Sequence, residues 1–196
     1  MDMDEGAVRY TQAVLIDDSQ SIHKGDFILE SDGGWHFSKG DEDVLETIDG
    51  KNRLITRSLQ NWHTHLAMQL NARDFSDGLH LEEWLQKSIF PTEKNLDPEM
   101  CSIGVKAAAA EIIRNGCSFA NDMYHFPEAI GPVLEKAGLR GIVSGPITSW
   151  PPSDDAETGE AKRRLQSLLS SQEKNSKVSY GVASHSVYTC SEETLL

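Results

Sequence analysis

The chain has 196 residues, of which 31 are acidic and 18 are basic, giving a formal net charge of −13. It offers no basic patch that could replace the counterions of a nucleic-acid backbone, which excludes that class of partner. Three cysteines without a Cys-x-x-Cys spacing, an acidic start without an apolar export segment and no stretch of membrane-spanning length predict a cytoplasmic protein with no membrane partner.

Residues 8–55 alternate short β-like runs with turn signals. The runs at 13–16, 27–30 and 35–37 are separated by Lys24-Gly25-Asp26 and Asp32-Gly33-Gly34. This pattern predicts part of a small β domain.

Two histidines follow a run of β-forming residues at 54–62. His63 and His65 are two residues apart, so on a strand their imidazoles point to the same face and can coordinate one metal ion. The competing interpretation is an exposed strand that carries two histidines by chance. The position of the pair at the carboxyl end of a strand favours a site, because parallel α/β proteins build their sites there.

From residue 54 onward, strands alternate with helices, which is typical of a parallel sheet with helical crossovers. The clearest helix runs from Pro98 to about Asn115, with Asp97 as N-cap and Gly116 closing it. Four strands are expected in all, about half the number of a (β/α)8 barrel. The remaining expected strands span 118–122, 139–144 and 178–183, and the other helices span 126–137 and 158–172.

Asp122 ends the second of these strands, which makes it a candidate site residue. A carboxylate that caps the loop or the next helix is the alternative, because aspartates are common in turns. His80 and His125 border loops on the same side, and an ordinary surface role is favoured for both.

Several sequence motifs, taken in order, resemble those of the amidohydrolase superfamily. Within it, they are most like the branch of cytosine- and adenosine-type deaminases and triazine chlorohydrolases. This branch includes the S-adenosylhomocysteine and methylthioadenosine deaminases. The motifs are Asn61-Trp62-His63-Thr64-His65, Ile89-Phe90-Pro91-Thr92-Glu93, Asn121-Asp122-Met123-Tyr124 and Ser184-His185-Ser186. The resemblance implies an α/β fold: the first half of a metal-dependent (β/α)8 TIM-type barrel over 54–196, with 1–53 as the N-terminal part of a small β-sandwich domain.

The same resemblance implies one divalent metal, zinc first and iron second, which activates water against a ring carbon of a nitrogen heterocycle. His63 and His65 fall on metal ligands of the family, Glu93 on a carboxylate that contacts the substrate's sugar, and His185 on a histidine that contacts the substrate. Deamination and dechlorination of a purine, pyrimidine or triazine both remain open, because each puts a metal-bound hydroxide on an electron-poor carbon.

The family's third metal histidine, proton-shuttling glutamate and metal-binding aspartate fall beyond Leu196. We therefore interpret the chain as the N-terminal half of a hydrolase acting on carbon–nitrogen bonds and expect it to be inactive alone. Half a barrel leaves two strand edges unpaired, so a homo-oligomer or pairing with the missing C-terminal half is expected. The alternative is a non-catalytic remnant that serves as a binding or assembly subunit.

Overall fold

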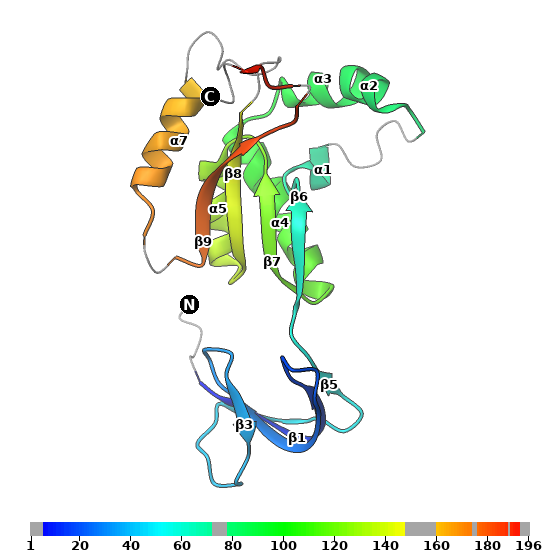
Figure 1. The fold of residues 1–196 in the computed structure, drawn as a ribbon, viewed down its shortest axis with the longest axis vertical. Helices are drawn as coiled ribbons and strands as arrows, with labels where there is room; N and C mark the ends of the chain where they lie inside the picture. Colours follow the sequence, from blue (N-terminus) through cyan, green and yellow to red (C-terminus); the bar gives the residue numbers. More distant parts are fainter. Residues whose placement is uncertain (1–5, 72–77, 148–159, 174–175, 188, 193–196) are drawn as a thin grey trace. The chain divides into compact units, whose positions relative to one another are not determined.

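The computed structural model describes residues 6–71, 78–147, 160–173, 176–187 and 189–192 (Figure 1). The chain divides into two compact units, Met1–Ser58 and Leu59–Leu196. Within the described residues, no helix combines the length and the apolar character needed to cross a membrane.

The first unit is a mixed β-sheet. Its strands are β1 (Val8–Ile16), β2 (Ile22–Leu29), β3 (Trp35–Phe37), β4 (Glu46–Asp49) and β5 (Leu54–Ile55). They follow the order β3-β2-β1-β4, and β5 also pairs with β1. Strand β2 is antiparallel to β1, whereas β4 and β5 are parallel to it. The described strands form one sheet, so the sandwich remains a prediction.

The run at 54–62, expected to be one strand, is two strands in different units. Leu54 and Ile55 pair with Val14 and Leu15 of β1, and strand β6 (Leu59–Thr64) then opens the second unit. Arg57 and Ser58 stand at the break, but no glycine or proline marks a turn there, so the sequence pattern favoured one continuous strand.

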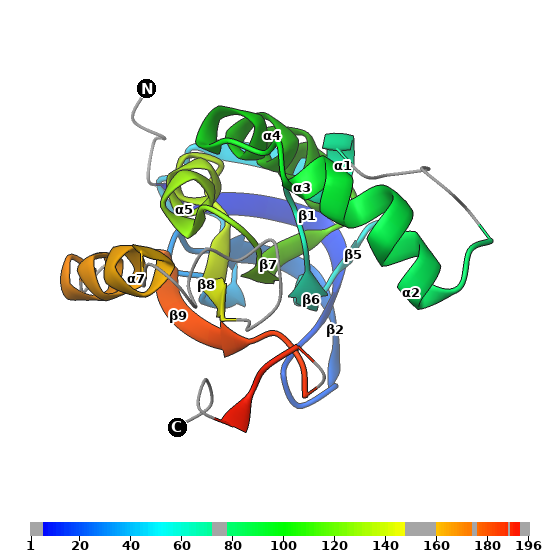
Figure 2. The same cartoon turned by 90° about the horizontal axis from the view of Figure 1, so that it is seen from above.

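The second unit is built on a four-stranded parallel sheet, as predicted. Its strands β6, β7 (Cys117–Met123), β8 (Arg140–Ile147) and β9 (Val178–Ser184) are adjacent in chain order. The helices α4 (Pro98–Arg114), α5 (Pro127–Lys136) and α7 (Glu160–Ser170) lie along one face of the curved sheet (Figure 2). Residues 158 and 159 of the last predicted helix lie outside the described residues.

Helix α4 begins and ends as its sequence predicts. The Asp97 side chain accepts a hydrogen bond from the backbone N–H of Met100 at 2.7 Å, and Pro98 occupies the first turn. Gly116 follows the helix at φ +78°, a left-handed conformation that glycine adopts without steric cost.

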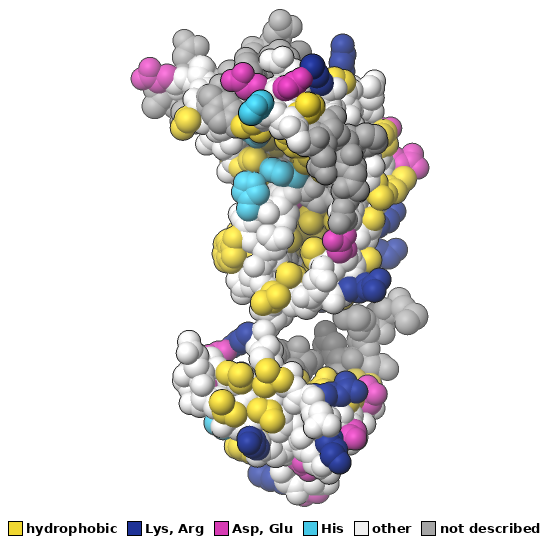
Figure 3. Space-filling view, turned by 90° about the vertical axis from the view of Figure 1, so that its right-hand side faces the viewer, with side chains coloured by type: hydrophobic (Ala, Val, Ile, Leu, Met, Phe, Trp, Pro, Cys, Tyr) yellow, Lys and Arg dark blue, Asp and Glu magenta, His cyan; other side chains and the backbone are white. Residues whose placement is uncertain are grey.

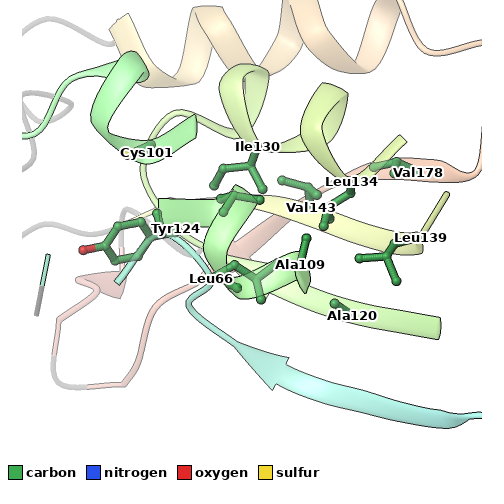
Figure 4. Close-up of a cluster of buried hydrophobic side chains, with 13 residues drawn as sticks. Leu66, Cys101, Ala109, Ala120, Tyr124, Ile130, Leu134, Leu139, Val143 and Val178 are labelled. Carbon is green, nitrogen blue, oxygen red and sulfur yellow. The ribbon is translucent and has the colours of Figure 1, made fainter. Parts of the chain in front are cut away.

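The core of this unit fills the space between the sheet and its helices (Figure 4). The strands contribute Ala120, Val143 and Val178, each at most 2% exposed. Helix α5 contributes Ile130 and Leu134, which are fully buried. The residues that alternate with these on β7 and β8 therefore point to the opposite face of the sheet.

Four short helical segments between β6 and α4 were not predicted. They are α1 (Met68–Asn71), α2 (Leu81–Trp84), the π-helical turn η1 (Leu85–Ile89) and α3 (Phe90–Glu93). The last three are continuous and bring Trp84, Phe90 and Glu93 to the wall of one cavity.

Candidate active site

A cavity of about 120 Å³ lies where the loops after the parallel strands meet the segment α2–η1–α3. Figure 3 shows histidine side chains, in cyan, beside hydrophobic side chains on one face of this unit. The carboxyl ends of parallel strands are the usual place for a site in this architecture. The cavity is lined by His65, Met68, Trp84, Leu85, Ile89, Phe90, Glu93, Met123, Tyr124, His125, Pro146, His185 and Thr189.

The two histidines of the His-Thr-His motif, His63 and His65, lie together at the end of β6. Their ring centroids are 5.0 Å apart and the ring planes are inclined by 83°. The Nδ1 atom of His65 lies 2.7 Å from the backbone oxygen of Met123. A carbonyl oxygen only accepts, so Nδ1 of the neutral ring carries the proton and Nε2 keeps a lone pair for a ligand.

His65 lines the cavity, whereas His63 is exposed and is not among the residues that line it. Among the hydrogen bonds of the described residues, none reaches the ring of His63; its backbone N–H donates to Asn61 Oδ1 at 3.3 Å. The fixed ring of His65 and the exposed ring of His63 therefore differ in how strongly the fold holds them.

Asp122 is fully buried and does not line the cavity. Its Oδ1 accepts a hydrogen bond from the backbone N–H of Leu66 at 2.6 Å and lies 3.0 Å from the hydroxyl of Thr64. Burial raises the pKa of Asp122 to about 6, although these two hydrogen bonds oppose the shift. The carboxylate thus ties the end of β7 to the segment that carries His65.

Glu93 and His125 form a polar pair at the wall of the cavity. Glu93 Oε2 lies 3.5 Å from His125 Nε2, and their side chains are 11% and 28% exposed. Burial, reinforced by the charge of Glu93, raises the pKa of the neighbouring Tyr124 far above its ordinary range, so its phenol stays protonated.

His185 lies at the cavity as a neutral imidazole. Burial lowers the pKa of His185, and the nearby His65 and His125 lower it further, whereas Glu93 opposes the shift. Its Nδ1 atom is 2.8 Å from the Thr189 hydroxyl. The ring can therefore present its other nitrogen to a ligand without carrying a charge near neutral pH.

The donor set fits a metal ion only in part. His63 and His65 supply two imidazoles, whereas a catalytic zinc site normally has three protein ligands and water. Within the part of the chain that the structure describes, no group of three or more His, Cys, Asp or Glu side chains could hold a metal ion. Two ligands on one strand leave most of the coordination sphere to other groups.

Sequence reasoning singled out His65, Glu93 and His185, and all three line one cavity. It favoured a surface role for His125 and did not consider Tyr124, and both of these line the same cavity. A signal for them was present, because they directly follow the strand that ends at Met123. His80, which borders a loop on the same side in the sequence-based prediction, is exposed and does not line the cavity.

The sequence pattern of the amidohydrolase family matches residues 54–196. The chain is 39% identical over 153 residues to 5′-deoxyadenosine deaminase of Methanothrix thermoacetophila, covering 77% of this chain and 35% of that protein. Among other matching relatives is a 5-methylthioadenosine/S-adenosylhomocysteine deaminase of Archaeoglobus fulgidus, which is 36% identical over 76% of this chain and 34% of its own length.

Solved structures match the fold of the chain over most of its length. An adenosine deaminase from Xanthomonas campestris with bound zinc has a TM-score of 0.74 at 24% identity, covering 96% of this chain and 44% of that one. Other structures with this fold include an atrazine chlorohydrolase. The chain thus spans less than half the length of the proteins it matches.

Proposed function

Because the chain belongs to the amidohydrolase family, we propose that its second unit supplies the metal-binding and substrate-binding side of a hydrolase active site. The reaction we propose is removal of an exocyclic amino group from an adenosine-type ring by water, with release of ammonia. The names of these two relatives favour deamination over dechlorination. The compartment we propose is the cytoplasm.

One observation carries this proposal: a histidine with a fixed tautomer faces a cavity that also holds Glu93 and His185. Nδ1 of His65 donates a hydrogen bond to the backbone oxygen of Met123, which leaves Nε2 as the metal-binding atom. His63 is adjacent and contributes the second imidazole. A divalent metal held there, zinc by preference, would supply a water acidic enough to act as a nucleophile near neutral pH.

The other residues of the cavity bind and orient the substrate. The side chains of Trp84 and Phe90 provide an apolar, aromatic surface against which a planar ring can pack. His185, held neutral, can share a hydrogen bond with a ring nitrogen, and the Glu93 carboxylate can accept one from a sugar hydroxyl. We assign no proton-transferring residue among the described residues, so the chain alone is expected to bind and not to turn over.

Equilibrium binding of adenosine and of free adenine to the zinc-loaded chain tests this function. Glu93→Gln should weaken adenosine binding by about tenfold or more, since a hydrogen bond to a charged group contributes about 1.5 to 3 kcal/mol, and should hardly change adenine binding. Glu82→Gln, at an exposed position of α2, is the matched control. Adenosine binding that is absent, or equal in both variants, would contradict the proposal.

A second candidate function is assembly with another chain. Strands β6 and β9 are the outer strands of the parallel sheet, and Leu59 on β6 and Val182 on β9 are 62% and 53% exposed. Unpaired edges with apolar side chains favour association. A homo-oligomer, or pairing with further strands of the same barrel, would cover them.

A further inference from the structure

The end of strand β7 holds the segment around His65 at several points. Asp122 Oδ1 accepts from the N–H of Leu66, the residue after His65, at 2.6 Å. The hydroxyl of Thr64, the residue before it, lies 3.0 Å from the same oxygen. The backbone oxygen of the next residue of β7, Met123, accepts a hydrogen bond from Nδ1 of His65 at 2.7 Å. Both neighbours of the histidine and its ring are thus tied to two consecutive residues.

Asp122 cannot act on a ligand in the cavity directly. It has no exposed surface, and it follows the alternation of Ala120 toward the helices. A carboxylate buried on that side influences the cavity only through the backbone and side chains that it holds.

We infer that Asp122 is a positioning residue for metal binding: it fixes the Thr64–Leu66 segment so that Nδ1 of His65 stays protonated and hydrogen-bonded to the Met123 oxygen, and Nε2 is offered to the metal. His65 is then the preorganised ligand, and the exposed ring of His63 is recruited when the metal arrives. The inference rests on the proposed metal-binding function, but the orientation of His65 exists without metal and is measurable by itself.

The physical reason is preorganisation. A ligand held in one rotamer and one tautomer before binding loses less conformational freedom when the metal binds. Outer partners that orient a metal-binding histidine typically change metal affinity by about 10- to 100-fold when they are removed. Asp122 holds the backbone N–H of Leu66 and the hydroxyl of Thr64, one on each side of the ligand, so its loss should act on His65 first.

The test compares Asp122→Ala, Asp122→Asn and Val143→Ala in the full 196-residue chain. Asparagine keeps an acceptor oxygen for the Leu66 N–H and serves as the conservative rescue. Val143 is fully buried and directly opposite Asp122 on β8, so its truncation loosens the same sheet without touching the His65 segment. Nitrogen NMR of the histidine rings, without metal, reports the tautomer of His65, and a zinc titration reports affinity.

We expect one Nδ1-protonated form of His65 in the wild type, Asp122→Asn and Val143→Ala, and a mixture of tautomers in Asp122→Ala. Zinc affinity should fall by about 10- to 100-fold in Asp122→Ala and only a few-fold in the two others. An unchanged His65 tautomer in Asp122→Ala, or an equal loss of affinity in Val143→Ala, would overturn the inference. Absence of zinc binding in the wild type would instead refute the proposed function, and the NMR comparison would still decide the role of Asp122.

Discussion

The two sides of the parallel sheet differ in how completely they are built. The side under α4 and α5 is closed, with Ala120, Val143 and Leu134 all fully buried. At the edge strand β6, Leu59 and Trp62 are 62% and 60% exposed, next to the exposed His63. The helix-covered side therefore supplies the close packing of this unit, whereas the candidate active site lies on the side that is open.

The largest expected effect comes from opening a cavity on the closed side. Leu134→Ala should lower the free energy of unfolding by about 3 kcal/mol, because Leu134 is fully buried in α5 and its truncation removes apolar contacts. Denaturant unfolding measures this loss. A loss below about 1 kcal/mol would mean that the helix layer contributes little to stability.

The cap of α4 should contribute less than a core side chain. Asp97→Ala removes the acceptor of the Met100 N–H and should lower the free energy of unfolding by about 1 kcal/mol, whereas Asp97→Asn keeps an acceptor and should stay close to the wild type. The same unfolding experiment compares the two variants. Equal losses in both would show that charge at the helix start, and not the hydrogen bond, is what matters.

A smaller, pH-dependent effect is expected where α5 meets the start of β9. Glu135 accepts hydrogen bonds from the Ser176 hydroxyl and from the N–H groups of Lys177 and Val178. Although burial opposes the shift, these bonds lower the pKa of Glu135 below its ordinary value. Its stabilisation is therefore present above that ordinary value and lost as pH falls through the lowered pKa.

Glu135→Gln should accordingly lower the free energy of unfolding at neutral pH by about 0.5 kcal/mol, since an exposed charge contributes little. The difference from the wild type should vanish in acid. Unfolding curves measured across this pH range check the sign, and a difference that grows as pH falls would refute it.

The smallest stability effect is expected at the open edge. Leu59→Lys should change the free energy of unfolding by no more than about 0.5 kcal/mol, because the side chain is mostly exposed. It should reduce self-association measured by sedimentation, since a lysine on an edge strand disfavours pairing with another chain. Unchanged association would show that this edge is not where copies meet.

Much of the closed side could be predicted from the sequence. Asp97, Pro98 and Gly116 are local signals, and they gave the limits of α4; the four parallel strands followed from the alternation of apolar runs and helices. The break between β5 and β6 was missed because the residues between Ile55 and Leu59 include no glycine or proline that would mark a turn.

The open side was harder to predict because its cavity is made by distant segments. The short helices after β6 carry no long periodic pattern, yet they bring Glu93 within 3.5 Å of His125. The buried position of Asp122 depends on the direction of alternation along β7, which the sequence leaves open. The His63–His65 pair was visible because two residues of spacing place both rings on one face of a strand.

A zinc titration of the 196-residue chain tests the central claim most directly, with His63→Ala/His65→Ala as the test variant and His23→Ala/His36→Ala as the matched control in the first unit. Our account predicts weak zinc binding, because two histidines provide only part of a site, with loss in the test variant and retention in the control. Zinc uptake that persists in the test variant, or no uptake by the wild type, would contradict it.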